Sequence, residues 1–297
     1  MTSTAAARDS RRRQQQLEAA ARARAARVRR RRRQLVGGGV AVVLVVVGAM
    51  LAVSALTGSS GSKGSSGKSS YADGTAIAKM LIATPSQTLS SIGVGTVKRA
   101  PVAVQDAALT SNGKPEILYL GADYCPFCAA ERWPLVLALG RFGTFSHIGL
   151  TTSAHQDVFP DTATFSFHDV GYRSDYLSFV ARELYDNVAV SRGHYRPLDK
   201  ATNSELALLT KYGSSFPLVD FAGRYVQRGA SYDPGVLKGM SADDIAMSIA
   251  SVQSPTAQGV GGAANMLTAA ICSVTKGQPA NVCTDPAVVA ATSKLHG

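Results

Sequence analysis

The sequence contains few of the side chains that bind metals, with only four Cys and five His. No two His stand at the spacing of a zinc-ligand pair, and Cys272 and Cys283 are too far apart in the sequence to form one. A structural zinc site needs four ligands, which usually come as two closely spaced pairs. We therefore expect no metal site in this protein.

Outside its first residues the chain also lacks an excess of charge of either sign. The net charge is +11, but residues 1–34 contain twelve Arg against one Asp and one Glu, and the remaining chain has nearly equal numbers of basic and acidic residues. The basicity thus belongs to a tail and not to a folded binding face. We expect no nucleic-acid partner and interpret 1–34 as a basic cytoplasmic tail.

Charge is absent altogether from Leu35 to Leu56, a run rich in Val, Ala and Leu. About 20 such residues span a bilayer core, and positive charge next to a span stays cytoplasmic. Residues 35–56 therefore predict one transmembrane helix that contacts the lipid membrane, with the C-terminal part outside. A cleaved signal peptide ending near Val53-Ser54-Ala55 is the alternative, although the run is longer than usual for one.

Residues 57–70 contain mostly Gly and Ser, which predicts a flexible linker. We expect residues 71–297 to form one extracytoplasmic domain. All four Cys lie in this part of the chain, where disulfides are permitted. Their even number predicts two pairs: Cys125 with Cys128, and Cys272 with Cys283 as a structural disulfide. A second redox pair at the latter positions is the alternative.

The most informative motif is Tyr124-Cys125-Pro126-Phe127-Cys128. It follows the apolar strand predicted at Glu116–Gly121 and precedes a helix predicted at Ala129–Phe142. This order places Cys125 at a helix N-terminus, where unpaired N–H groups and the helix dipole favour the thiolate. His147–Thr152 is expected to be the next strand, parallel to the first, which would complete a βαβ unit.

The rest of the domain is expected to combine an insertion with a helical end. We predict a helical insertion over Ser153–Asn203, containing a short strand and a helix at Ser174–Tyr185. A helix at Ser204–Tyr212 and a hairpin follow the insertion. The predicted hairpin strands are Leu218–Phe221 and Arg224–Gln227, and the C-terminal helices are Ser241–Ser251, Ala263–Thr275 and Pro286–Lys294.

Strand, Cys-x-x-Cys, proline-containing helix and a later Phe216-Pro217 before a hairpin together resemble the thioredoxin superfamily. The likeness is good over Glu116–Thr152 and Ser215–Gln227. It implies an α/β, thioredoxin-like fold in which Pro217 is cis and faces the Cys pair. A trans proline that only starts an edge strand is the alternative.

A closer resemblance is to a family of membrane-anchored, thioredoxin-like proteins known as domain of unknown function 929. It rests on Ala129-Ala130-Glu131-Arg132-Trp133, Thr164–Phe167 and Ala269–Cys272. One departure from thioredoxins is Tyr119, which stands where many of them carry a buried acid. Asp123 is a possible substitute, but it is expected to be a solvated loop acid, and Glu131 and Arg132 a solvated face with Trp133 in the core.

These observations predict a membrane-anchored thiol–disulfide oxidoreductase that needs no cofactor. Cys125 would be the nucleophile and Cys128 the resolving thiol. Pro126, Phe127 and the backbone of Phe216 would contact the substrate, beside Pro217. Expected partners are extracytoplasmic proteins that contain cysteine, and a redox partner that recycles the pair. The alternative is an inactive peptide-binding or scaffold module with structural disulfides. Oxidase, reductase and isomerase all remain compatible with the sequence.

Overall fold

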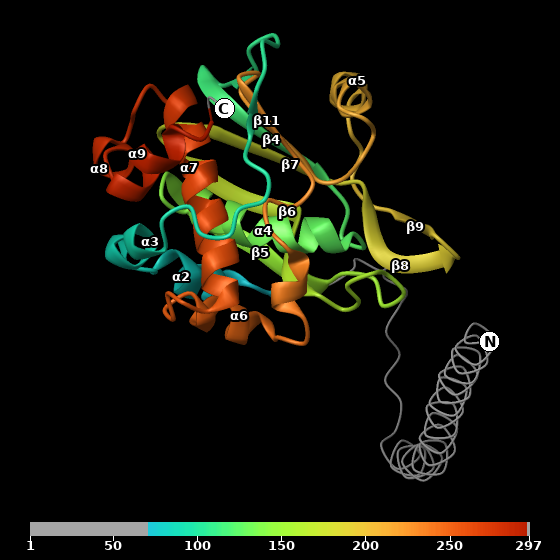
Figure 1. The fold of residues 1–297 in the computed structure, drawn as a ribbon. Coiled ribbons are helices and arrows are strands. Elements are labelled where there is room, and N and C mark those ends of the chain that lie inside the picture. Colours follow the sequence, from blue (N-terminus) through green and yellow to red (C-terminus); the bar gives the residue numbers. More distant parts are fainter. Residues whose placement is uncertain (1–70, 296–297) are drawn as a thin grey trace, which may run out of the picture. The chain divides into compact units, whose positions relative to one another are not determined.

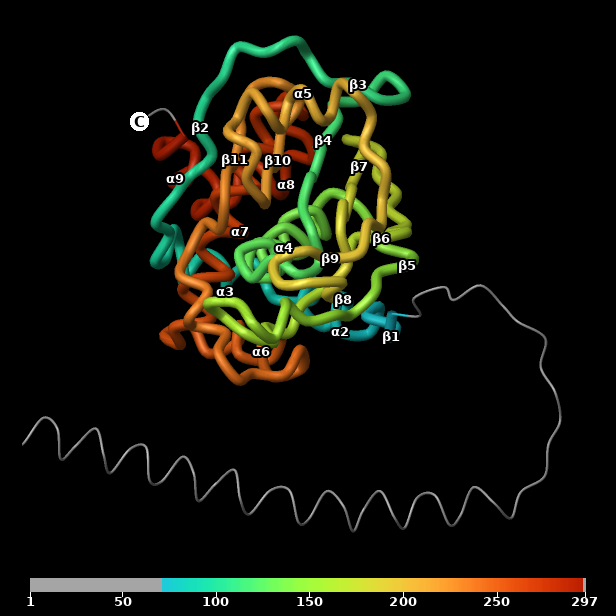
Figure 2. Tube along the Cα trace, turned by 90° about the vertical axis from the view of Figure 1, so that its right-hand side faces the viewer, coloured from blue at the N-terminus to red at the C-terminus, as the bar shows by residue number. Residues whose placement is uncertain are grey.

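The computed structural model describes residues 71–295. Its central sheet has the strand order β2-β11-β10-β4, β7 pairs with the other edge of β4, and the short β3 pairs antiparallel with the start of β4. Figure 2 shows these strands side by side, with β4 and β10 in the middle. The strands are β2 (Val102–Ala103), β3 (Thr110–Ser111), β4 (Lys114–Gly121), β7 (Ser178–Glu183), β10 (Leu218–Phe221) and β11 (Tyr225–Arg228).

Strand β4 is the centre of this mixed sheet. Its residue Leu118 pairs with Asp220 of antiparallel β10 and with Val180 of parallel β7. The last five residues of β4 are buried, because the sheet is covered on both faces. The predicted strand at Glu116–Gly121 and the predicted hairpin are both confirmed.

A second, antiparallel sheet has the order β1-β5-β6, and β8 pairs with β9 in a separate hairpin. In Figure 1 the β8–β9 hairpin projects from the body of the domain. These strands are β1 (Ala72–Asp73), β5 (Gly143–Thr152), β6 (Ala163–Ser174), β8 (Tyr185–Ser191) and β9 (His194–Pro197).

The prediction that His147–Thr152 is the parallel neighbour of β4 was wrong. The segment His147–Thr152 is a strand within β5, but β5 pairs only with β1 and β6 in the second sheet. The parallel partner is β7, which follows the β5–β6 hairpin in the chain. Sequence could not choose between the two segments, because strand pairing depends on contacts between distant residues.

The expectation of a helical insertion was also wrong for most of that region. Strands β6, β7, β8 and β9 occupy it, and the predicted helix at Ser174–Tyr185 contains β7. Side chains of β7 alternate between two apolar clusters: Phe179 packs in the main core and Val180 in a smaller one. This pairing and packing overrides the good helix propensity of Leu, Ala, Arg and Glu.

Helix α4 (Pro126–Leu139) follows β4 and is buried along almost its whole length (Figure 1). It packs against α7 and β6, and Trp133 at its centre is fully buried, as expected. Pro134 lies inside this helix. The other helices are α2 (Thr75–Ile82), α3 (Ser86–Ile92), α5 (Asn203–Lys211), α6 (Ala242–Ser248), α7 (Gly262–Val274), α8 (Ala280–Cys283) and α9 (Pro286–Thr292).

The predicted helical end of the domain is confirmed. Ser241 caps α6 with a reciprocal hydrogen-bonded box to Asp244, which satisfies N–H groups at the helix start. Cys272 near the end of α7 forms a disulfide with Cys283 at the end of α8. The structure is therefore a mixed α/β domain with C-terminal helices.

The predicted tail (1–34), transmembrane segment (35–56) and linker (57–70) lie outside the described residues. Within residues 71–295, no helix is both long enough and apolar enough to cross a bilayer.

Candidate functional site

The sequence predicts that Cys125 begins the helix, and the structure places it at the N-cap of α4. Pro126 is the first helical residue, a position where the N–H that proline lacks would have no helical partner. The Cys125 sulfur accepts a hydrogen bond from the backbone N–H of Cys128, over 3.3 Å. Both thiols are free in this structure.

A rim formed by Phe216 and Pro217 lies beside this sulfur. The Phe216–Pro217 peptide bond is cis, as the resemblance predicted. The Cys125 thiol donates a long hydrogen bond of 4.0 Å to the carbonyl oxygen of Phe216. The carbonyl oxygen of Pro217 accepts from the N–H of Gly229 over 2.8 Å, which ties the rim to the end of β11.

The two thiols differ in access. Cys125 is 7% exposed and Cys128 is fully buried, whereas Phe127 between them is 40% exposed. The smallest apolar cluster of the domain consists of Ala122, Cys125 and Cys128, with Tyr124 and Phe216 packed against it. A reagent therefore reaches Cys125 over Phe127 and Phe216, and reaches Cys128 only through Cys125.

The pKa values of the two thiols are displaced in opposite directions. The pKa of Cys125 is lowered, chiefly because the Cys128 side chain donates a hydrogen bond to its sulfur. Burial opposes this, while backbone N–H groups and the Arg132 charge support it. Burial raises the pKa of Cys128 well above its ordinary value. The thiolate form is therefore more favoured at Cys125 than at Cys128.

A buried ionic cluster lies beneath the Cys pair. Arg132 follows Cys128 by one helical turn and binds both carboxylate oxygens of Glu183, through Nε at 2.8 Å and Nη2 at 2.7 Å. Its Nη2 atom also donates to the carbonyl oxygen of Ala122 over 2.8 Å and lies 3.4 Å from Asp123. All three charged side chains are completely buried.

Each acid of the cluster has further donors. Asp123 accepts hydrogen bonds from the Tyr71 hydroxyl at 2.6 Å and from Ser166 at 3.2 Å. Glu183 accepts from the backbone N–H of Phe167. Burial raises the pKa of Asp123, and it raises the pKa of Glu183 to about 7. The cluster contains two acids and one base, so burial favours retaining a proton there at neutral pH.

Three buried polar atoms of this cluster have no hydrogen-bond partner among residues 71–295: the Tyr119 hydroxyl, Asp123 Oδ1 and Arg132 Nη1. Tyr119 is the residue that replaces the buried acid of many thioredoxins, and its ring lies under the Arg132 guanidinium. Unpaired buried polar atoms are rare, because each costs the free energy of its lost hydration.

Two expectations about charged residues were therefore wrong. Asp123 is not a solvated loop acid, because it is fully buried with Tyr71 and Arg132 as partners. Glu131 and Arg132 are not a solvated face, because α4 is enclosed by sheet and helices on all sides. Glu131 accepts from the Ser231 N–H and hydroxyl, each over 2.7 Å.

Aromatic side chains of the insertion contact the loop that contains the Cys pair. Tyr195 on β9 stacks on Tyr124 at a ring distance of 4.0 Å, and Phe159 meets Phe127 edge to face at 5.9 Å. Other aromatic rings of the same region, such as Phe165, pack in the core. The β8–β9 hairpin and the loop before β6 thus form walls of the site.

A groove of about 840 Å³ lies next to the rim. Phe127 and Phe216 line it together with Val102 of β2 and the buried Val226 of β11.

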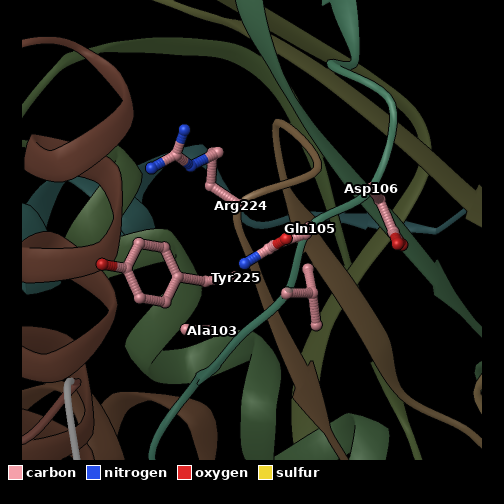
Figure 3. Close-up of a pocket in the computed structure, with 6 residues that line it drawn as sticks. Ala103, Gln105, Asp106, Arg224 and Tyr225 are labelled. Atoms are coloured by element: carbon pink, nitrogen blue, oxygen red, sulfur yellow. The ribbon is translucent and has the colours of Figure 1, made fainter.

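Another pocket, of about 530 Å³, lies at the opposite end of the β10–β11 hairpin, between Ala103–Asp106 and Arg224–Tyr225. Figure 3 shows Arg224 and Asp106 pointing away from each other there. Asp106 instead binds Lys211 and the Tyr212 hydroxyl. This pocket contains none of the sequence-predicted site residues.

The C-terminal pair is a disulfide, as predicted, and it joins α7 to α8 away from the free thiols. Within residues 71–295, no three His, Cys, Asp or Glu side chains gather in a way that would hold a metal ion.

Sequence reasoning missed the ionic cluster. The spacing of Cys128 and Arg132 is a signal for part of it, since residues four apart share a helix face. Nothing in the sequence connects Arg132 with Glu183, which is 51 residues away on β7. The contact of Tyr195 with the active-site loop likewise arises only from folding.

Residues 100–214 match the family model described as "Domain of unknown function (DUF929)". The matched segment contains Cys125, Cys128 and the ionic cluster, and it ends just before Pro217. No curated protein and no solved structure matches the chain.

Proposed function

We propose that this chain is a membrane-anchored, extracytoplasmic thiol–disulfide oxidoreductase with a thioredoxin-like fold. One observation carries the proposal: the Cys125 sulfur lies at the start of α4, above the buried Cys128 and 4.0 Å from the Phe216 carbonyl oxygen. This arrangement supplies a nucleophile, a resolving thiol and a backbone rim within one site.

The fold assignment rests on strand order. The strands lie side by side in the order β11-β10-β4-β7. Strand β4 leads directly into the Cys-bearing helix, and Pro217 precedes β10. Strand β10 runs antiparallel to β4, whereas β7 and β11 run in the direction of β4, and this arrangement supports a thioredoxin-like sheet. The β5–β6 hairpin, the β8–β9 hairpin and the C-terminal helices are additions around that core.

The reaction proceeds in two exchanges. The Cys125 thiolate attacks one sulfur of a substrate disulfide, and the other substrate sulfur leaves as a thiolate, which gives a mixed disulfide. Cys128 then loses its proton and attacks the Cys125 sulfur, and the second substrate thiolate leaves. The substrate gains two electrons, and the protein ends with a Cys125–Cys128 disulfide. Running backwards, the same steps oxidise a substrate dithiol.

Backbone groups at the rim favour an extended substrate. Among the described residues, the Phe216 N–H has no hydrogen-bond acceptor, and the Phe216 carbonyl oxygen accepts only from the Cys125 thiol. A substrate strand can pair with these two groups while its cysteine meets Cys125.

The location of the enzyme follows from the sequence. The uncharged run Leu35–Leu56, preceded by Arg29–Arg33, supports an anchor with residues 71–297 outside the cytoplasm. Substrates would then be secreted or envelope proteins with cysteines. A membrane or extracytoplasmic redox partner must return the Cys pair to its starting state.

A second function, peptide binding without redox chemistry, is favoured by one observation: Cys125 is only 7% exposed. In that case the groove would hold a peptide and the thiols would stay inert. The two functions differ in whether the folded protein presents a reactive sulfur.

Alkylation of the folded, full-length protein by iodoacetamide across pH 5–9 tests the proposal. We expect Cys125 to react as a thiolate below the ordinary thiol pKa, about 8.5. The Cys128→Ser variant should accumulate a mixed disulfide with a peptide whose cysteine is held in a disulfide, as the second sulfur of that disulfide leaves, and Cys125→Ser should form none. If Cys125 reacts only after unfolding, the enzyme proposal fails and the binding module remains.

A further inference from the structure

The groove beside Cys125 is bordered by three basic side chains from three separate parts of the chain. Arg99 precedes β2, Arg228 ends β11, and Lys294 follows α9. All three residues are exposed. No acidic residue lines the groove, so these positive charges converge on one apolar recess.

Two other basic side chains of the domain are paired with acidic residues. Lys98, adjacent to Arg99, is paired with Asp233 at 2.9 Å, and Arg196 is paired with Asp186 at 2.6 Å. Within residues 71–295, Arg99, Arg228 and Lys294 form no ion pair. Three unpaired charges around a recess create a positive potential there, which attracts an anionic partner.

The position of Arg99 links this charge to the reactive sulfur. Its Nη1 atom lies next to Gly229, 3.1 Å from the position that a Cβ atom on this glycine would occupy. The Gly229 N–H in turn binds the Pro217 carbonyl oxygen. A chain that pairs with the Phe216 rim therefore passes directly under the Arg99 guanidinium.

Apolar groups define the rest of the occupant. Phe127 and Val102 are 40% and 59% exposed, and the buried Val226 also lines the groove. The volume of about 840 Å³ is within the range for specific ligand sites. A recess with apolar walls and a cationic border suits a peptide that carries both apolar and acidic side chains.

We propose that this groove selects substrates in which Asp or Glu residues, in an extended segment, flank the reacting cysteine. This inference rests on the proposed function and names its substrate class. The acidic side chains meet Arg99, Arg228 and Lys294 while the adjacent cysteine sulfur meets Cys125.

The test uses the full-length Cys128→Ser protein in a neutral detergent. The probes are two nine-residue peptides with one central cysteine activated as a thiopyridyl disulfide, flanked by three Glu or by three Lys. Cys125 attacks the peptide sulfur, and the released thiopyridone is followed by absorbance. We expect the acidic peptide to react about tenfold faster or more at low salt, with the ratio falling as salt rises.

Matched charge variants locate the effect. Arg99→Gln, Arg228→Gln and Lys294→Gln combined should bring the ratio close to one. Lys79→Gln, Lys238→Gln and Lys276→Gln combined remove the same charge from exposed positions outside the groove, and should preserve the ratio.

Two outcomes overturn this inference while leaving the enzyme intact. One is an equal rate for the acidic and the basic peptide. The other is a reaction with oxidised glutathione whose rate depends on salt and on the three groove charges as strongly as that of the acidic peptide does, because this would indicate a site for small anions. Failure of every peptide and of glutathione to react would instead remove the proposed function itself.

Discussion

At the scale of single residues, the reactivity of Cys125 depends on what its sulfur contacts. Position at the helix start is visible in the sequence, but the largest contribution to its lowered pKa comes from the Cys128 side chain. The charge of Arg132, beneath both thiols, acts in the same direction. The pKa of Cys125 therefore depends both on local hydrogen bonds and on the charge of the ionic cluster.

Substitutions at Cys128 separate hydrogen bonding from redox chemistry. Cys128→Ala removes the side-chain donor, so the pKa of Cys125 should rise toward the ordinary thiol value. Cys128→Ser retains a hydroxyl donor and should keep the pKa lowered. The rate of iodoacetamide alkylation against pH gives both values. Identical profiles for the two variants would mean that the Cys128 side chain has no such role.

The buried Arg132–Glu183 pair should show the energetics of a desolvated ion pair. Arg132→Met alone leaves two buried acids without their cation, so the free energy of unfolding should fall by about 3–5 kcal/mol. Arg132→Met combined with Glu183→Leu should lose less than the sum of the two single changes. Urea denaturation measures each value, and strict additivity would show that the pair is not coupled.

At the scale of elements, α4 connects the Cys pair to the groove wall. Glu131 on this helix binds Ser231, whose carbonyl oxygen accepts from the N–H groups of Lys98 and Arg99. The disulfide between α7 and α8 holds the helices behind α4, and closing so short a loop contributes about 2–3 kcal/mol. Helices α4 and α7 thus pack against each other and support the loop that contains the thiols.

Glu131 should make stability depend on pH. Burial raises its pKa to about 8, against 4.5 for an unshifted glutamate. Between these values the unfolded chain has lost the proton and the folded chain has kept it, so stability falls as pH rises from about 5 to 8. Glu131→Gln can satisfy both Ser231 groups without a charge.

Thermal unfolding between pH 5 and pH 9 measures this effect. The free energy of unfolding of Glu131→Gln minus that of the wild type should rise by at least about 1 kcal/mol between pH 5 and 8. Above pH 8 this difference should stay constant. Parallel stability curves for the two proteins would show that Glu131 does not keep its proton.

At the scale of the whole molecule, two parts of the chain have separate roles. The first 70 residues contain the basic tail, the uncharged run and the Gly/Ser linker, which predict attachment to a membrane and reach above it. Residues 71–295 form the α/β domain with the thiols and the groove.

Membrane attachment is tested on the full-length protein in cells. We expect it to remain in the membrane fraction after alkaline carbonate extraction, and Cys125 to be labelled from outside by an impermeant thiol reagent. Val43→Lys with Val46→Lys should abolish retention, because each central charge costs about 2.5–3.5 kcal/mol in a span. Val43→Leu with Val46→Leu is the matched control. Release of the unaltered protein by carbonate would contradict a transmembrane anchor.

The sequence by itself determined the local features: the strand Glu116–Gly121, the helix that starts at the Cys pair, the hairpin after Pro217 and the Cys272–Cys283 disulfide. Each depends on residues close together in the chain, whose propensity, capping or spacing is readable. Only the tertiary structure decided which strand lies parallel to β4, that Arg132 meets Glu183, and that Arg99, Arg228 and Lys294 border one groove. Those arrangements arise from pairing and burial between distant segments, where packing outweighs local preference.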